Sequence, residues 1–233
     1  MNNFIPIFTE NIDHYIHILY VPDTEGESLM APGNGTRQEQ SQQRRERILE
    51  AARSCFGSNG FAAATVGAIA SDAGVSNGLL YQFFRGKEEL FQVVVSEAVR
   101  DWVRALVPSD AEKLSPSEKL EAMFRRSVTF CRNHPLLPAI LTGDELLQLA
   151  RIGNPDRNRI HAHRDLIASV VQDGITAGEF RADLDVASVA DVIQQLHIDY
   201  STRAYRRDPQ FPSHDALIDA ACRFVHDAVK AVH

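Results

Sequence analysis

The chain has 233 residues, 44% of them hydrophobic and 24% charged, which is enough for one or two domains with a real core. Its formal net charge of −7, taken as a whole, argues against a simple nucleic-acid binder, because such domains are usually basic. Three cysteines that are far apart and form no CxxC pair exclude a disulfide framework and give no sign of a zinc site, so reduced thiols are expected.

The charge is unevenly distributed along the chain. Residues 1–36 hold five acidic side chains and no Lys or Arg. Residues 37–87 hold seven basic and four acidic side chains, a net charge of +3, and residues 88–233 carry a net charge of −5. A basic segment therefore lies inside an acidic chain.

Residues 1–40 differ in composition from the rest of the chain. They are acidic and contain several Pro and Gly, and from Met30 to Gln43 they become polar and Gln-rich, which is typical of a linker or a flexible tail. We expect a poorly ordered extension here. Two interpretations remain open: an arm that packs on the body or on a partner, or a native start at Met30 that leaves residues 1–29 outside the natural protein.

No segment of the sequence suggests a membrane or an export route. No apolar run approaches the roughly 20 residues of a membrane helix. The N-terminus lacks the positive region of a secretory signal, and its apolar stretch is short and interrupted. We expect a cytoplasmic protein without a membrane partner.

From residue 41 the pattern is helical almost to the end. The first expected helix, 42–57, places Ile48, Ala51, Ala52, Cys55 and Phe56 on one apolar stripe and is stopped by Gly57 and Gly60. Eight further helices are expected: after Thr65, after Ser76, from Lys87 to Pro108, from the Ser115 capping box to Asn133, over 137–151, from Asn154-Pro155 to Gly178, from Asp185 to Arg207, and over 214–231. Few strand patterns are present, so the fold class is all-α.

The segment from Thr65 to Phe84 predicts two helices joined by a tight turn. Gly74 tolerates the positive φ that such a turn needs, Val75 can fill the space between the helices, and Ser76 can cap the second helix. In a helix-turn-helix, the first residues of that second helix enter the major groove. A plain αα-hairpin has the same turn, so the turn alone leaves both interpretations open.

The flanking residues extend this pattern. The run Thr65-Val66-x-x-Ile69-Ala70-x-x-Ala73-Gly74-Val75-Ser76-x-Gly78-x-Leu80-Tyr81-x-x-Phe84-x-x-Lys87-x-x-Leu90 resembles the DNA-binding domain of TetR-type transcriptional regulators. The preceding Arg45-x-x-Ile48-x-x-Ala51-Ala52-x-x-x-Phe56-x-x-x-Gly60-Phe61 matches that family's first helix. The resemblance covers about residues 42–95. It implies a three-helix DNA-binding domain over 41–87 and a helical ligand-binding and dimerisation domain over 88–233.

The resemblance and the side-chain chemistry together assign DNA-binding roles. Phosphate contacts are expected from Thr65, from Lys87, from Arg44 or Arg45, and from the hydroxyl of Tyr81, whose ring should pack on the bundle. Base contacts are expected from the exposed side of the second helix: Ser76, Asn77, Gly78 and Gln82.

One position departs from the family pattern. Phe83 stands where the family commonly has His or Tyr, so one phosphate contact is in doubt. Whether Arg85 compensates for it stays open, and the adjacent Phe84 is expected in the core.

The C-terminal body resembles the family in length, in helix pattern and in its Gly174-x-x-x-Gly178-x-Phe180-x-x-Asp183 helix ending. The resemblance implies a homodimer built on the last two helices, and the apolar stripe of the final helix supplies the candidate interface residues Leu217, Ala220, Ala221, Phe224, Val225 and Ala228. It also implies an effector site within the body. The candidate lining residues are Trp102, Met123, Phe124, Val128, Leu141, His163, Ile167, Val171, His197 and Tyr200. Ordinary core packing is the alternative for each of these.

No signature of an enzyme is present, whether a GxSxG elbow, an HExxH zinc motif, a P-loop or a dinucleotide fingerprint. The histidines show no metal-ligand spacing, so we expect no metal and no cofactor. The expected function is that of a ligand-responsive DNA-binding regulator, a repressor released from its operator by a lipophilic or aromatic effector. Two alternatives stay open: a helical binding or scaffold module that retains the head without binding an operator, and an activator or global regulator that needs no small ligand.

Overall fold

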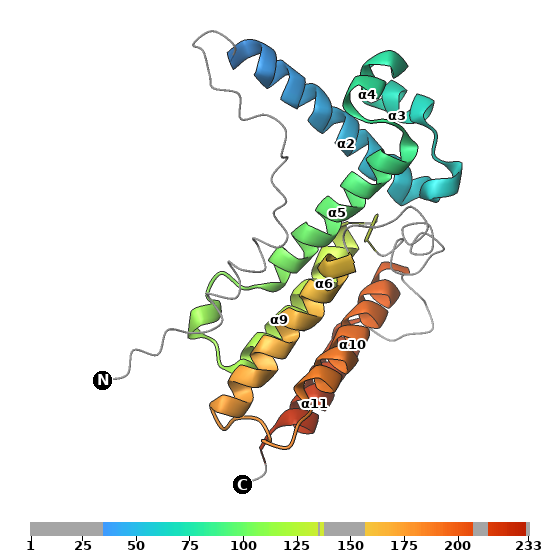
Figure 1. Cartoon of the computed structure of the whole chain (residues 1–233). Helices are drawn as coiled ribbons and strands as arrows, with labels where there is room; N and C mark the ends of the chain where they lie inside the picture. Colours follow the sequence, from blue (N-terminus) through green and yellow to red (C-terminus); the bar gives the residue numbers. More distant parts are fainter. Residues whose placement is uncertain (1–34, 135, 138–156, 207–213, 232–233) are drawn as a thin grey trace. The chain divides into compact units, whose positions relative to one another are not determined.

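The computed structural model describes residues 35–134, 136–137, 157–206 and 214–231 (Figure 1). These residues form eight α-helices and one short 3-10 helix, which confirms the predicted all-α fold. The contacts between them define two compact units: a head unit of residues 35–98 and 136–137, and a body unit of residues 99–134, 157–206 and 214–231. No helix among the described residues is long and apolar enough to cross a membrane.

The head unit begins with a long helix, α2 (Gly35–Ala63). It starts seven residues before the predicted 42, so the prediction of a linker or tail was wrong for residues 35–41. These residues are Gln-, Arg- and Glu-rich, and such side chains favour a helix even where nothing packs on them. Gly60 adopts φ 72° and breaks the helical path near its end, as predicted for this glycine.

Three further helices complete the head unit. They are α3 (Val66–Asp72), α4 (Asn77–Phe83) and the first half of α5 (Lys87–Leu106). The rings of Phe56, Phe61 and Phe91 meet with centroids 4.8–6.1 Å apart and join α2 to α5. Because Phe91 belongs to this aromatic cluster, the compact head unit extends to Ala98, beyond the boundary predicted at residue 87.

An arginine adds an electrostatic link between the same two helices. The guanidinium of Arg53 on α2 donates to Glu97 on α5 at 2.6 Å, and to Glu50 and Glu46 on its own helix at 2.8 and 3.2 Å. The three carboxylates raise the pKa of Arg53 despite its partial burial. The ion pair with Glu97 therefore fixes α5 against α2 within the head unit.

The body unit contains η1 (Ala111–Lys113), α6 (Pro116–Asn133), α9 (Arg157–Thr176), α10 (Val186–Arg206) and α11 (His214–Val229). The predicted capping box is present: the Ser115 hydroxyl accepts from the Glu118 backbone N–H, and the Glu118 carboxylate accepts from the Ser115 N–H at 2.8 Å. The helix predicted over 137–151 lies almost entirely outside the described residues.

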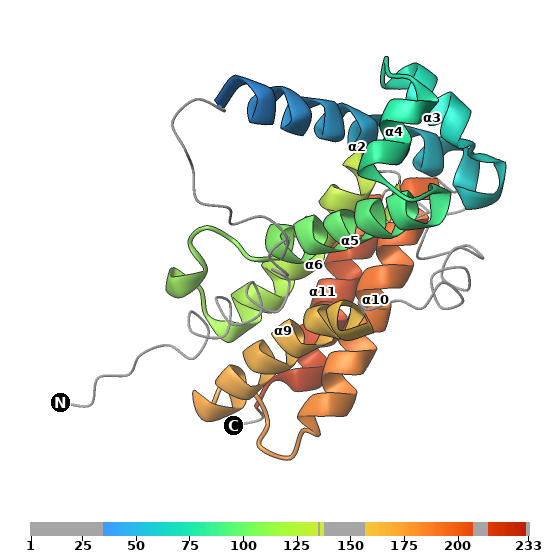
Figure 2. The ribbon, with the colours of Figure 1, turned by 45° about the horizontal axis from the view of Figure 1, so that its top comes forward.

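The helices of the body unit run side by side (Figures 1 and 2). Helix α10 packs against α6, α9 and α11, and α6 also contacts α9 and α11. Phe124 and Val128 of α6 form a buried cluster with Ile218 and Ala221 of α11. The tip of the turn after α9 is tied to the end of α11, because Arg181 N–H donates to the Val229 carbonyl and Ala231 N–H donates to the Glu179 carbonyl.

The end of α9 depends on two glycines of the predicted helix-ending motif. Gly178 adopts φ 74°, and the backbone N–H groups of Glu179 and Phe180 both donate to the Gly174 carbonyl at 3.0 Å. This turn folds the Phe180 ring directly onto Gly174, and a Cβ atom there would overlap the ring. The ring is 2% exposed, so it has no room to move aside.

The substitution Gly174→Ala should therefore lower the free energy of unfolding by about 2–3 kcal/mol through overpacking against Phe180. Gly178→Ala has open space around its Cβ position and should cost about 1 kcal/mol, from left-handed backbone strain alone. Urea unfolding monitored by circular dichroism measures both. An equal loss of unfolding free energy in the two variants would show that overlap with the Phe180 ring adds nothing to the cost of Gly174→Ala.

Candidate functional site

Helices α3 and α4 are each capped by the side chain that the sequence suggests. The Thr65 hydroxyl accepts from the Ala68 N–H at 3.1 Å, and the Ser76 hydroxyl accepts from the Leu79 N–H at 3.2 Å. Between the helices, Gly74 adopts φ 64° and the Val75 N–H donates to the Ala70 carbonyl at 2.9 Å. The predicted helix–turn–helix geometry is present in the head unit.

One face of α4 is free of packing within the head unit. Asn77, Gly78, Tyr81 and Gln82 are exposed on it, whereas Leu80 on the opposite face is fully buried. Tyr81 is 55% exposed, so about half of its surface is covered, and the fully buried side chain of α4 is that of Leu80. No atom lies within 4 Å of the Cβ position of Gly78. This face offers amide and phenol groups to a partner.

Lys87 occupies a different environment from the one predicted. Its ammonium donates to the carbonyls of Phe61 and Ala64 at 2.9 and 3.1 Å, with a longer bond to Ala62 at 3.5 Å. It also lies 4.3 Å from the centre of the Phe61 ring. The ammonium thus binds carbonyls at the end of α2 and just after it, so Lys87 caps α2 in this structure. Its predicted contact with a DNA phosphate stays a prediction.

The two candidate arginines of α2, Arg44 and Arg45, differ in their exposure. Arg45 is half-buried, with its guanidinium 5.6 Å from the centre of the Phe84 ring. Phe84 itself is buried, as predicted, at 3% exposure. Arg44 is exposed, so of the two alternatives Arg44 is the one that presents a free cation at the surface.

In the body unit, most of the predicted effector-lining residues form the core. Eight of them are at most 3% exposed: Trp102, Met123, Phe124, Val128, His163, Ile167, Val171 and His197. Tyr200 is half-buried beside the cluster of α6 and α11, and Leu141 lies outside the described residues. Burial of this degree is what ordinary core packing also produces.

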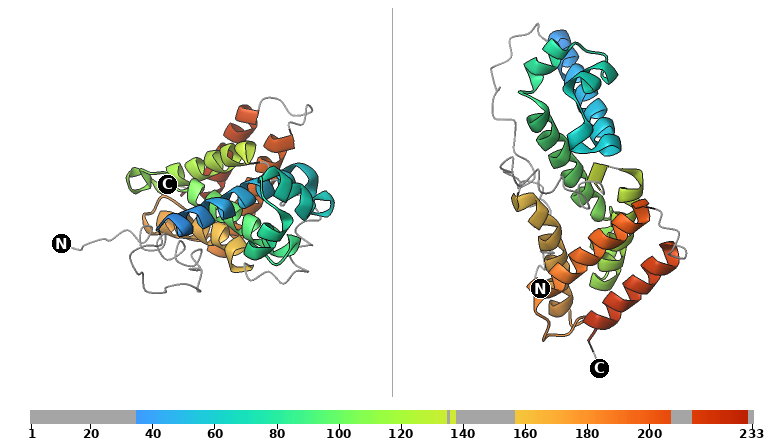
Figure 3. Two further views of the ribbon diagram at one scale, coloured as in Figure 1. Left: turned by 90° about the horizontal axis from the view of Figure 1, so that it is seen from above. Right: turned by 90° about the vertical axis from the view of Figure 1, so that its right-hand side faces the viewer.

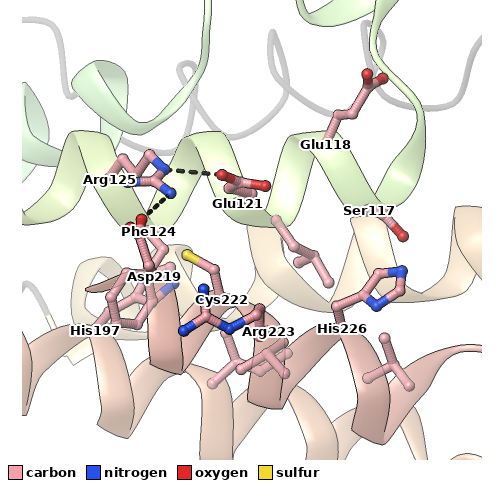
Figure 4. Close-up of a pocket in the computed structure, with 14 residues that line it drawn as sticks. Ser117, Glu118, Glu121, Phe124, Arg125, His197, Asp219, Cys222, Arg223 and His226 are labelled. Carbon is pink, nitrogen blue, oxygen red and sulfur yellow. Dashed lines mark hydrogen bonds and ion pairs between the residues drawn. The ribbon is translucent and has the colours of Figure 1, made fainter. Parts of the chain in front are cut away.

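A pocket of about 430 Å³ opens between α6, α10 and α11 (Figure 4). Two of the predicted effector residues, Phe124 and His197, line it together with the apolar side chains of Leu120, Ile193, Val225 and Val229. Charged side chains surround the apolar part, and Arg125 among them is held by Glu121 at 2.9 Å and Asp219 at 2.5 Å. The volume is in the range of small-molecule sites.

Two buried histidines meet behind this pocket. Nε2 of His163 on α9 and Nδ1 of His197 on α10 share a hydrogen bond of 2.9 Å. The two residues are 1% and 0% exposed. Burial lowers the pKa of His197 to about 3, and burial together with the neighbouring His197 lowers the pKa of His163 well below its usual value. Both imidazoles are therefore neutral near pH 7.

The predicted dimer residues of α11 divide into two faces. Ala221 and Val225 are buried within the protomer at 5% and 9% exposure, and Ala221 belongs to the buried cluster with Ile218. The other four, Leu217, Ala220, Phe224 and Ala228, follow one another at helical spacing on the neighbouring face and stay partly or fully exposed. Phe224 is 67% exposed.

The exposed apolar face continues onto α10. Val192 is 57% exposed, and with Val189 and Leu196 it forms one wall of a shallow groove whose other wall holds Phe224 and Ala228. Figure 3 shows α10 and α11, orange and red, beside one another. Exposed apolar side chains gathered in this way are typical of an interface.

Comparison with known proteins decides the family. The model described as "Bacterial regulatory proteins, tetR family" matches residues 48–94. The HTH-type transcriptional repressor KstR2 of Mycobacterium tuberculosis is 35% identical over 154 residues, which span 61% of this chain and 72% of that repressor. The chain belongs to the TetR family.

Solved structures of other TetR-type regulators share the fold. The ketosteroid transcriptional regulator KstR2 of Mycobacterium tuberculosis superposes with a TM-score of 0.62 at 27% identity, over 81% of this chain and 96% of that one. FadR of Bacillus subtilis, solved in complex with stearoyl-CoA, gives a TM-score of 0.67 at 21% identity, over 81% of this chain and all of that one. The TetR-family match places the chain among transcriptional regulators and not among enzymes.

Two features of this TetR-family chain were missed at the sequence level. The pairing of His163 with His197 joins residues 34 positions apart on two helices, and no local spacing indicates it. The outward face of α10 was missed because Val189, Val192 and Leu196 repeat as any amphipathic stripe does. Among the described residues, no three His, Cys, Asp or Glu side chains gather as metal ligands.

The buried histidine pair predicts a fall in stability in mild acid. Between pH 7.5 and 5.5, unfolded histidines bind protons near pH 6.5 that the folded pair excludes, so the free energy of unfolding should drop by about 2–3 kcal/mol. Urea unfolding at the two pH values measures this drop. The double variant His163→Phe/His197→Phe should lack it, while His226→Gln on the surface should keep it. A wild-type stability that is flat over this range would show that the pair is not neutral.

Proposed function

We propose that the chain is a dimeric DNA-binding repressor whose affinity for its operator is lowered by a lipophilic effector. The observation that carries this proposal is the free face of α4. It follows a capped turn and presents Asn77, Gly78, Tyr81 and Gln82, all four of which are exposed. A recognition helix needs such a face in order to enter a major groove.

Base recognition falls to the two amides of this face. Asn and Gln side chains can bond both edge atoms of adenine, and each such pair contributes roughly 1–3 kcal/mol of discrimination. The open space around Gly78 allows the helix to approach the bases closely. Ser76 keeps its O–H free to donate while its oxygen caps α4.

Phosphate contacts are assigned to groups around this face. Thr65 lies exposed at the start of α3, and the Tyr81 hydroxyl projects from α4. Arg44 supplies a cation from α2. Lys87 contributes indirectly, because it holds the end of α2 in place beside α3. These few contacts fit the modest net charge of +3 between residues 37 and 87.

The effector proposal rests on the body unit and on the relatives. One relative is named a ketosteroid regulator, and a protein of the same fold was solved with stearoyl-CoA. The pocket between α6, α10 and α11 has mostly apolar walls, which suits a ligand of that lipophilic class. Binding lowers DNA affinity only if the ligand prefers a body conformation in which the heads are wrongly spaced.

A second copy of the chain is the proposed occupant of the apolar face of α10 and α11. The groove with Val192 and Phe224 on its walls would be covered by the same groove of the partner, as in a two-fold interface. Two heads are also what a site with two half-sites requires, since each recognition helix reaches one major groove. The final helix thus serves the protomer core with one face and the dimer with the other.

The substitution Gln82→Ala should weaken binding to the operator by about 5- to 100-fold and leave binding to unrelated DNA unchanged, because it removes a base contact. Tyr81→Phe should weaken binding to the operator and to unrelated DNA by the same factor, because it removes a phosphate contact. That factor should be smaller than the loss of operator binding in Gln82→Ala. Fluorescence anisotropy with the gene's own upstream DNA at two salt concentrations separates these effects. Gln172→Ala, on the exposed side of α9, is the matched control. Wild-type affinity in both head variants would place the DNA surface elsewhere.

The substitution Phe224→Glu should convert the dimer to a monomer, because it places a charge on the exposed apolar face without disturbing the protomer core. Sedimentation velocity measures the change, and operator binding should fall with it. Gln172→Glu carries the same charge on another body helix and should stay dimeric. If Phe224→Glu sediments as the wild type does, the interface lies on a different surface.

A further inference from the structure

The first turns of α2 extend away from α3 and α4 of the head unit (Figures 1 and 2). Every side chain from Arg37 to Arg44 is exposed except that of Ser41, which is half-buried. Beyond Arg37, the first fully buried side chain of the helix is that of Ile48. The segment 37–47 contains no apolar residue, so it has no side chain to place in a hydrophobic core or groove.

One side of this segment carries a row of arginines. Because an α-helix turns by about 100° per residue, positions that are seven and three residues apart lie on the same side. Arg37, Arg44 and Arg47 have this spacing, and all three are exposed. These three residues, the arginine stripe, extend along about 15 Å of the helix axis at 1.5 Å per residue.

The acidic side chains nearby lie on the side of α2 that faces α5, and they are already paired. Glu46 and Glu50 bind the guanidinium of Arg53, which also binds Glu97 of α5. Glu50 follows Arg47 by three residues, yet it is bonded to Arg53 at 2.8 Å. No member of the arginine stripe forms a hydrogen bond or an ion pair with another described residue. The stripe therefore keeps its three charges without a counter-charge in the part of the chain that the structure describes.

The arginine stripe does not stabilise the free protein. Like charges three residues apart on a helix repel one another, and Arg44 and Arg47 have this separation. The same residues arranged as Glu–Arg pairs four apart would stabilise the helix instead. The sequence thus sorts its positive charges onto one exposed side, which fits a polyanion outside the chain.

We propose that the arginine stripe binds the phosphate backbone of DNA, as a second contact beside the one made by the exposed face of α4. Guanidinium groups match phosphate oxygens in pairs, and a row of them along a helix is the typical electrostatic footprint of a nucleic-acid site. Each DNA strand carries one phosphate per 3.4 Å of axis, so every cation of the stripe has a phosphate within its reach. This inference rests on the proposed DNA binding and deepens it.

The start of the stripe is connected to the recognition helix within the head unit. The guanidinium of Arg45 lies 5.6 Å from the centre of the Phe84 ring, and Phe84 is the residue that ends α4. A cation–π contact of this kind ties the turn that holds Arg44 and Arg47 to the end of α4. When α4 meets DNA, the stripe is therefore carried to the same duplex.

DNA fits the stripe better than an anionic membrane does. A helix that lies on a membrane surface inserts an apolar face between the lipids, in addition to its charges. The segment 37–47 has no such face. Contacts with a phosphate backbone need charge and hydrogen-bond donors alone, and the stripe offers both.

The test uses the full-length protein and two duplexes of equal length: the gene's own upstream DNA and an unrelated sequence. Fluorescence anisotropy gives the affinities between about 50 and 200 mM salt. For two bound protomers, Arg37→Gln/Arg47→Gln should reduce the slope of log affinity against log salt by about 4, because each lost phosphate contact removes about 0.9. The reduction should be the same for both duplexes, since phosphate contacts carry no sequence information.

The matched control is Gln38→Glu/Gln42→Glu. It changes the net charge of the chain by the same amount, at exposed positions of the same helix that lie outside the stripe. It should keep the wild-type slope to within about one. Urea unfolding should give wild-type stability for Arg37→Gln/Arg47→Gln, because both arginine side chains are exposed, so a loss of DNA binding in that variant is not a loss of folding.

The outcomes separate this inference from the proposed function. If the wild type binds its upstream DNA and Arg37→Gln/Arg47→Gln keeps the wild-type slope, the inference is overturned and the proposed function stands. An equal loss of slope in Gln38→Glu/Gln42→Glu would overturn it too, because net charge would then be the cause. Binding to phosphatidylglycerol vesicles that only the arginine variant loses, with its DNA slope unchanged, would assign the stripe to a membrane instead. If the wild type does not bind its upstream DNA at about 50 mM salt, the proposed function itself fails, and the inference with it.

Discussion

The exposed face of α4 depends on two helices, α3 and α4, that are too short to be stable on their own. Helices α3 and α4 have seven residues each, well below the length at which an isolated helix is stable in water. Their order comes from tertiary contacts: the buried side chains of Ile69 and Leu80, the two hydroxyl caps, and the Gly74 turn. The aromatic cluster and the capping ammonium of Lys87 then fix the end of α2 beside them. The α4 side chains can occupy defined positions only because this surrounding frame is packed.

In the body unit, one helix, α11, serves two purposes. Helix α11 carries two adjacent apolar stripes, one buried against α6 and α10 and one left exposed. A chain intended to stay monomeric would place charged residues on the second stripe. Two charged residues of α11, Asp219 and Arg223, lie instead beside the pocket, where Asp219 engages Arg125. Core, pocket and proposed dimer contact therefore meet on a single helix, so the proposed effector site and the proposed interface share α11.

Local features of the fold could be predicted from the sequence, and long-range ones could not. The Ser115 capping box, the Gly74 turn and the Gly178 helix ending each depend on a few neighbouring residues, so their sequence pattern suffices. The start of α2 was missed because residues 35–41 show no apolar periodicity. Which stripe of α11 faces inward depends on α6 and α10, so a list of apolar positions could not separate Val225 from Phe224. The role of Lys87 depends on carbonyls more than twenty residues away.

Gly78 shows how folding and recognition can make opposite demands on one position. A glycine inside a helix is less stable than alanine by roughly 0.5–1 kcal/mol, because its unfolded backbone has more freedom to lose. The free protein gains no packing in return, since its Cβ position faces open space. Selection for higher stability of the head unit would therefore replace this glycine. Laboratory evolution for thermal stability would do the same. Under the proposed DNA binding, the bare backbone at Gly78 lets α4 approach the bases closely, which gives this glycine a use that the free protein does not.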